Sequence, residues 1–182
     1  MNLRLLLLRQ HVPASVRRAV LRDLIAATAR AFERRPPDTA GSSEPELTAH
    51  MIECSRSWAE EALRTGADLD RLDRRMFREA SRLGRHARRR LHVSSEADGL
   101  AAAQILYGSI GIDFRPRGTR EVSIPRCAFA CAYVPDVCRL MSSMDSGLIA
   151  GLTGARGLRF TERITEGAAA CHALVLHAGG TT

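Results

Sequence analysis

Apolar residues recur every three or four positions between residues 13 and 109, a spacing that places them on one face of a helix. We therefore predict a series of amphipathic helices separated by short polar breaks. Residues 2–8 fit either a short strand or the start of a helix, and the pattern leaves both open. The predicted helices cover residues 13–32, 43–66, 69–91 and 95–109.

Several of these helices have sequence signals for their ends. Ser43 and Glu46 form a capping-box pattern at the start of the second helix. Gly66 suits the left-handed position that follows a helix. Ser95 is a suitable N-cap for the helix that follows it.

The pattern changes after residue 115. EVSIP reads as a short strand stopped by Pro125, and helical spacing returns over Cys127–Ala132 and Val137–Leu152. Two β-prone runs then follow, GLRFTERIT and AACHALVLH, separated by Glu166-Gly167-Ala168. We predict that they form a tight hairpin.

This order of elements predicts an α+β fold in which helices dominate. The helical N-terminal two-thirds is expected to pack against a small antiparallel sheet formed mainly by the C-terminal third. At 182 residues, the chain fits a single domain over 1–182. Its parts are a helical wrapper (1–111) and a cysteine-containing strand–helix–hairpin unit (119–178).

Composition adds an expectation about the compartment. No apolar run reaches the ~20 residues that span a bilayer, and the opening NLRLLLLR is too short for a signal peptide. We therefore predict a cytoplasmic protein with no membrane partner. Its five cysteines should then be mostly reduced.

All 27 basic residues are arginine, and the formal net charge is +7. Nine arginines lie on the predicted helix 69–91, where they could cover a phosphate backbone. However, they occupy the positions that the apolar stripe leaves to solvent, and Asp70, Asp73 and Glu79 lie among them. We favour a solvated face, or a surface for an acidic partner or another copy of the chain, over a nucleic-acid site. The nine are Arg71, Arg74, Arg75, Arg78, Arg82, Arg85, Arg88, Arg89 and Arg90.

Four cysteines lie between residues 127 and 171. Cys131 and Cys138, like Cys54 earlier in the chain, fall in apolar helical patterns, so we expect them in the core. A metal site formed by the four cysteines and His172 is an alternative. The C-x3-C-x6-C spacing lacks the geometry of a zinc knuckle, so we predict neither a metal nor another cofactor.

The chemistry-bearing residues of this segment follow a recognisable order. Cys127 follows the EVSIP strand, Cys138 ends VPDVC, Asp145 comes next, and the turn 165–167 leads to Cys171. This order resembles the C-terminal signature of the L-2-amino-thiazoline-4-carboxylic acid hydrolase family, over roughly the last third of the chain.

Two positions depart from the family pattern. Ser142 stands where the family has the cysteine of its Cys-x-x-Asp motif, and His172 stands where an acidic residue usually follows the final cysteine. Serine is a much poorer nucleophile than cysteine unless a base activates it. If that cysteine has a chemical role in the family, this chain should have a different activity or none.

The resemblance implies hydrolytic opening of a small cyclic amidine that bears a carboxylate. Cys127 is then the candidate nucleophile, with Arg126 expected to lower its thiol pKa, and Asp145 the candidate general base. Cys171 and His172 are further catalytic candidates. Because neighbours in a strand point to opposite faces, we do not expect these two to share one pocket.

The same reading assigns the substrate-binding residues. Arg126, Arg159 or Arg163 would bind the carboxylate through two parallel hydrogen bonds. Ser142 would lie against the substrate in place of the family cysteine.

The prediction from sequence is thus a hydrolase-like enzyme that opens a C–N or C–S bond of a small cyclic carboxylate, or that has diverged to a biosynthetic role. Two alternatives stay open. One is a catalytically lapsed module of the same fold that binds a small molecule or a partner. The other is an arginine-rich nucleic-acid-binding protein. The sequence does not decide whether the chain forms a homo-oligomer.

Overall fold

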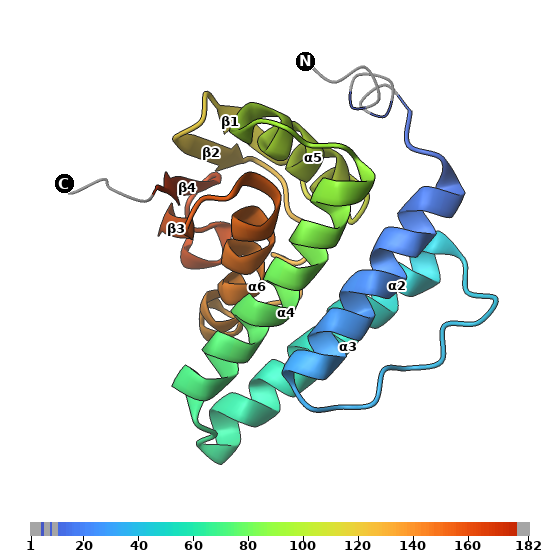
Figure 1. Cartoon of the computed structure of the whole chain (residues 1–182). Helices are drawn as coiled ribbons and strands as arrows, with labels where there is room; N and C mark the ends of the chain where they lie inside the picture. The colour runs from blue at the N-terminus through green and yellow to red at the C-terminus, as the bar shows by residue number, and fades with distance from the viewer. Residues whose placement is uncertain (1–4, 6–7, 9–10, 178–182) are drawn as a thin grey trace.

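The computed structural model describes Leu5, Leu8 and residues 11–177, so the expectation for 2–8 lies outside the described residues apart from those two leucines. Four helices come first in the described chain, and a fifth lies beside a small sheet (Figure 1). This confirms the α+β fold class. The helices are α2 (Ala14–Ala31), α3 (Glu44–Thr65), α4 (Leu69–Arg90), α5 (Glu96–Gly108) and α6 (Pro135–Thr153).

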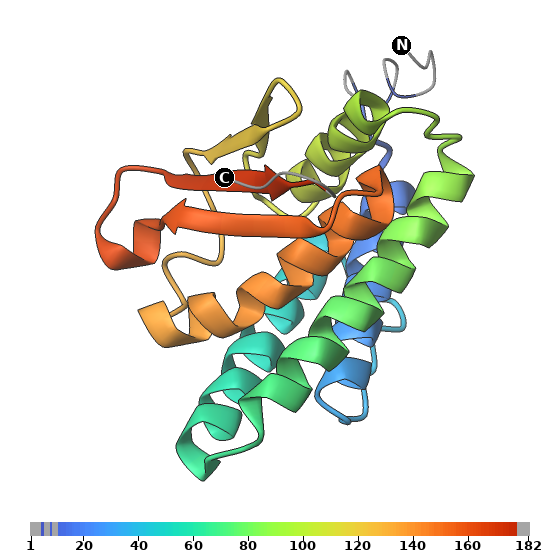
Figure 2. The same cartoon turned by 60° about the vertical axis from the view of Figure 1, so that its left-hand side comes forward.

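The sheet is antiparallel throughout, with the spatial order β1-β2-β4-β3. Burial alternates along β4, so that Cys171, Ala173 and Val175 face the core while His172 lies on the other face. In Figure 2 the β3–β4 hairpin lies across α6. The strands are β1 (Arg115–Arg117), β2 (Glu121–Ile124), β3 (Gly157–Glu162) and β4 (Cys171–Leu176).

The predicted helix ends are confirmed. The Ser43 backbone N–H donates to the Glu46 carboxylate at 2.8 Å, which completes the capping box of α3. Gly66 takes up the left-handed conformation (φ 66°) at the other end of that helix. The Ser95 hydroxyl accepts from the Asp98 N–H at 3.1 Å and so satisfies one of the otherwise unpaired amide groups of the first turn of α5.

Three local expectations were wrong or incomplete. The segment predicted as a helix over Cys127–Ala132 instead has an isolated β-bridge from Cys127 to Ile112, followed by turns over residues 128–132. A helical pattern of only six residues cannot offset the cost of starting a helix. The β3–β4 connection is longer than a tight turn and contains a short 3₁₀ helix, η1 (Ile164–Glu166). Strand β1 was not predicted at all, since its RPR sequence has the composition of a loop.

The closest helix contact joins α4 to α6, and glycines make it possible. An added Cβ at Gly147 would lie 2.2 Å from the Phe77 carbonyl oxygen, and at Gly151 2.3 Å from the Ser81 oxygen. At Gly84, on α4 itself, it would lie 2.5 Å from the Leu148 oxygen. Backbone therefore meets backbone where the helices cross, and α6 is held against α4 at a distance that only glycine allows.

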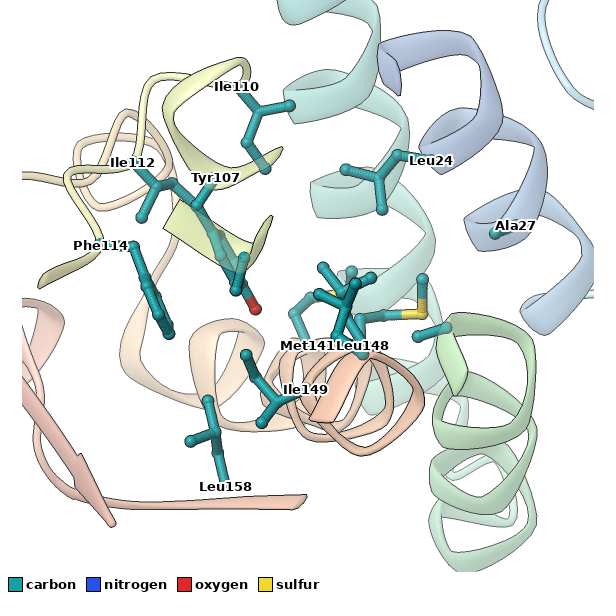
Figure 3. Close-up of a cluster of buried hydrophobic side chains, with 14 of the residues drawn as sticks. Leu24, Ala27, Tyr107, Ile110, Ile112, Phe114, Met141, Leu148, Ile149 and Leu158 are labelled. Carbon is teal, nitrogen blue, oxygen red and sulfur yellow. The ribbon is translucent and has the colours of Figure 1, made fainter. Parts of the chain in front are cut away.

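A single cluster of buried apolar side chains joins the helices to the sheet. Figure 3 shows its centre, where Leu24, Tyr107, Leu148 and Leu158 come from four different elements. Helix α6 thus contacts α4 on one side and the sheet on another. Among the described residues, no helix is long and apolar enough to cross a bilayer.

We predict that Gly151→Ala destabilises the protein by about 1–3 kcal/mol, the usual cost of overpacking. The added methyl would collide with the backbone of Ser81 and force α6 away from α4. Urea unfolding followed by circular dichroism measures the change.

Gly108→Ala is the matched control, because a Cβ there meets no atom within 4 Å. It should leave stability unchanged or raise it by up to about 1 kcal/mol. Equal destabilisation by both substitutions would contradict the role of the crossing.

Candidate active site around Asp145

A small cavity lies between α6, the end of α5, the turns after β2 and the start of β4. Its volume is about 100 Å³ and its walls are mainly apolar. Three cysteines, two tyrosines and one carboxylate interrupt those walls. They are Cys127, Cys138, Cys171, Tyr107, Tyr133 and Asp145.

Asp145 lies on α6, seven residues after Cys138 and therefore on the same helix face. The residue as a whole is only half-buried, but its carboxyl group is desolvated in the cavity wall. The Tyr107 hydroxyl donates to its Oδ1 at 2.8 Å. Burial raises the pKa of Asp145 to about 6, although the Tyr107 hydrogen bond and the charge of Arg163 lower it in part. A carboxylate with a pKa near neutrality is a better proton acceptor than an ordinary aspartate.

Tyr107 is held in place by its own surroundings. Its ring stacks on Phe114, with centroids 4.6 Å apart and the planes 5° from parallel. Burial and the neighbouring Asp145 raise the pKa of its phenol well above the ordinary value, so the hydroxyl stays protonated and donates. In Figure 3 the hydroxyl of Tyr107 points toward α6.

The three cavity thiols are all held in the protonated state by burial. The pKa of Cys127 rises to about 12, with a smaller contribution from the charge of Asp145. Burial also raises the pKa of Cys138 and of Cys171. Asp145 and Cys171 influence the pKa of both Cys127 and Cys138, which indicates that these groups lie close together.

The expected effect of Arg126 on Cys127 was wrong. The Arg126 side chain is 83% exposed and lies 3.7 Å from the Asp113 carboxylate. Water screens a guanidinium in that position, whereas the thiol is desolvated. Burial therefore raises the pKa of Cys127, and Arg126 does not lower it.

Arg163, a candidate substrate-binding residue, does not line the cavity itself, and its Nε lies 3.6 Å from the Glu166 carboxylate. Its side chain is 14% exposed, and its guanidinium lies 4.4 Å from the centroid of the Phe160 ring. Its charge lowers the pKa of Asp145, Cys138 and Cys171. The Nη1 atom is buried and has no hydrogen-bond partner among the described residues. A buried donor of this kind is costly to leave unpaired.

His172 and Ser142 do not line the cavity. The expectation that Cys171 and His172 face opposite ways is confirmed, and His172 Nε2 lies 4.0 Å from the Glu162 carboxylate. The Ser142 hydroxyl donates to the Cys138 carbonyl oxygen at 2.8 Å, one turn back along α6. This hydrogen bond ties Ser142 to its own helix.

The remaining cysteines divide differently from the expectation. Cys131 is exposed rather than buried in the core, and its Sγ lies 3.3 Å from the Ala128 carbonyl oxygen. Cys138 lines the cavity instead of merely filling the core. All five thiols are free. Within the described part of the chain, no group of three or more histidine, cysteine or acidic side chains could hold a metal ion.

The arginine-rich face of α4 is partly paired within the protein. Glu79 is buried and accepts from Arg30 at 3.0 Å and from Arg82 at 2.7 Å. Arg75 pairs with Glu33, and the Arg85 side chain donates to the Ser81 hydroxyl at 2.6 Å. The Arg30–Glu79 contact joins α2 to α4, and Arg75 reaches Glu33 just beyond the end of α2. Together with the contacts within α4, they account for part of the arginine content without a nucleic acid.

Sequence reasoning missed Tyr107 and Tyr133, although a signal was present. They are the only two tyrosines in the chain, and each lies in an apolar stretch. A buried tyrosine usually needs a partner for its hydroxyl. Tyr107 pairs with Asp145, and Tyr133 shares a short hydrogen bond with Ser55 of α3.

Comparison with known proteins adds no relative. No family model, no curated protein and no solved structure matches the chain.

The raised pKa of Asp145 makes stability depend on pH. Below the unfolded pKa, near 3.8, the carboxyl is protonated in both states and this penalty is absent. Between about 3.8 and 6 the unfolded chain releases this proton while the folded protein keeps it, so stability falls as pH rises through that window. Above about 6 both states are ionised and the loss of stability is complete. The difference of about two units corresponds to roughly 3 kcal/mol.

We therefore predict that Asp145→Asn raises the free energy of unfolding at pH 8 and leaves it nearly unchanged at pH 4. The amide can still accept from Tyr107 but never carries the charge. Urea unfolding of both proteins from pH 4 to 8 measures this. Parallel profiles for the two proteins would show that Asp145 ionises without penalty.

Proposed function

We propose that the chain is a hydrolase-like enzyme that opens a C–N or C–S bond of a small cyclic substrate bearing a carboxylate. The observation behind the proposal is the convergence of Cys127, Cys138, Cys171 and Asp145 on one small, mainly apolar cavity from separate parts of the chain. Their order also resembles the signature of the thiazoline-carboxylate hydrolases. A buried carboxylate that costs stability is typical of a functional site.

Cys127 and Asp145 supply a nucleophile and its base. A thiol with a pKa of about 12 is unreactive at neutral pH, so its proton must leave as it attacks. Asp145, with a pKa of about 6, accepts that proton. A C–S bond forms to the ring carbon, and a ring C–N or C–S bond breaks as the departing atom takes the proton from Asp145. Water then attacks the same carbon and releases the Cys127 thiol.

Arg163 supplies the anchor for the substrate carboxylate. Its buried Nη1, which has no hydrogen-bond partner among the described residues, can donate to a carboxylate oxygen, while its Nε lies 3.6 Å from Glu166. Arg126 belongs to a different place. It lines an open hollow of about 560 Å³ that also includes Asp113 and Cys127. Since Cys127 and Ile112 line both the hollow and the cavity, this hollow is the proposed route by which the substrate arrives.

The five free thiols also support a cytoplasmic setting, where reducing conditions keep cysteines unpaired. The proposed enzyme needs no metal or organic cofactor, because the nucleophile, the base and the anchor are all side chains.

The test is turnover of 2-aminothiazoline-4-carboxylate and related cyclic amidines by the purified protein. We expect hydrolysis that falls by 10³-fold or more in Cys127→Ala and in Asp145→Asn, because each removes one half of the activated nucleophile. Loss of substrate followed by chromatography measures the rate.

Cys131→Ala is the matched control, since it removes a thiol that is exposed and outside the cavity. It should retain full activity. Absence of turnover on every compound tested, or turnover that survives Cys127→Ala, would refute the proposed mechanism.

A second function is favoured by one observation, the state of Ser142. The family pattern has a cysteine at the position of Ser142. Here the Ser142 hydroxyl donates to the Cys138 carbonyl oxygen, and Ser142 does not line the cavity. In this alternative the protein keeps the pocket as a binding module and has lost hydrolysis.

Ser142→Cys discriminates between the two. A gain of hydrolysis would identify a lapsed enzyme in which only this thiol is missing. If the native chain is inactive and Ser142→Cys is too, the pocket serves binding alone. Thermal stability should change by less than about 1 kcal/mol, because the sulfur is similar in size and stays on the same helix face.

A further inference from the structure

We propose that a second cavity, between α2, α4 and α5, holds an apolar arm of the substrate. This rests on the proposed function and specifies its substrate class: a carboxylate-bearing compound with a hydrocarbon substituent, rather than a bare small ring. The cavity has a volume of about 440 Å³, several times that of the cavity around Asp145.

The two cavities share a wall. Leu24, Tyr107, Ile110 and Leu148 line both of them. These side chains come from α2, the end of α5, the turn after it and α6, and Figure 3 shows them converging on a common region. A group bound at Asp145 is therefore separated from the larger cavity by one layer of side chains. Tyr107 contacts the Asp145 carboxylate and also lines the second cavity.

The cavity around Asp145 is too small to hold a substrate that also carries a substituent. At about 100 Å³, it is well below the roughly 300–1,000 Å³ of sites that enclose a ligand of drug size. It can accommodate the reacting centre but not a substituent as well. Beyond the shared wall, the neighbouring space is both large and mainly apolar.

The lining of the second cavity selects hydrocarbon. Its inner part is formed by aliphatic side chains such as Val20, Leu83, Leu91 and Leu106, which stay only half-buried. Two charged side chains of opposite sign, Asp23 and Arg90, also line the cavity and are exposed to solvent. Leaving so many aliphatic side chains partly in water costs stability, and an apolar occupant removes that cost.

The position of the small residues supports the same reading. Ala19 on α2 and Ala87 on α4 both line the cavity. Larger side chains at these two positions would fill the space between the helices. Ala87 is half-buried, whereas Ala19 is exposed at the opening of the cavity to solvent. Small side chains at both positions leave room for an occupant that is not part of the chain.

The test uses straight-chain fatty acids from hexanoate to dodecanoate, each below its micelle concentration, as inert probes of arm length. Isothermal titration calorimetry should show the dissociation constant falling about fourfold with each added methylene until the cavity is full. An affinity that does not change with chain length would overturn the proposal.

Ala19→Trp should reduce this dependence on chain length, because the indole closes the cavity from α2. Ala14→Trp is the matched control: it places the same side chain at an exposed position of the same helix, outside the cavity lining. It should bind the fatty acids as the native chain does. Ala87→Leu, a smaller change on α4, repeats the test if Ala19→Trp does not fold. If the affinity depends on chain length equally in Ala19→Trp and in Ala14→Trp, the fatty acids bind elsewhere and the proposal is overturned.

The outcome is separable from that of the hydrolysis assay. Dependence on chain length that Ala19→Trp removes supports the cavity even if no cyclic amidine is turned over. Conversely, Cys127-dependent hydrolysis with no dependence on chain length would support the enzyme and refute the arm. A dimer that dissociates in Ala19→Trp, seen by sedimentation velocity, would make a second copy of the chain the occupant and also refute it.

Discussion

The whole arrangement depends on how closely α6 approaches α4. Gly84, Gly147 and Gly151 let the two backbones touch, and this fixes both the depth and the rotation of α6. Once that face is committed to α4, the face that carries Cys138 and Asp145 must point into the space beneath α5 and β4. The position of the candidate site is therefore a consequence of helix packing. The sheet then closes the space from the other side, with Cys171 as its contribution.

The carboxylate of Asp145 makes this packing less stable than an apolar residue would. A carboxylate on a helix buried on several sides must either stay protonated or be stabilised by neighbours. Here the stabilisation is incomplete: one hydroxyl donates to it, and one guanidinium acts from a distance. An apolar residue of similar size would fit the core better. The fold retains a group that favours neither packing nor solubility, which is why chemistry is the more economical explanation of its presence.

Helices α2–α6 and strands β2–β4 followed from local patterns, because the periodic stripes, Ser43, Gly66 and Ser95 all act within a few residues. Strand β1 did not, because nothing in its RPR sequence favours a strand. The order of Cys127, Asp145 and Cys171 also marked residues that line one cavity. Local patterns could not show which residues that are far apart in the sequence come into contact. Tyr107 and Asp145 are 38 positions apart, and no sequence pattern near either residue predicts their hydrogen bond. The same reasoning explains the error over Cys127, whose neighbour in sequence was taken as its neighbour in space.

The protonated thiols have a consequence for how the protein behaves among other reactive molecules. Peroxides and general electrophiles attack thiolates, and a thiol with a pKa of about 12 offers almost none at cellular pH. The thiols around Asp145 are thus protected from unselective oxidation and alkylation. Reactivity in this protein would be conditional: only a molecule that fits against Asp145 and brings an electrophilic carbon to Cys127 meets an activated sulfur. Selectivity would then come from binding of the right substrate beside Asp145 rather than from a high intrinsic reactivity of the Cys127 thiol.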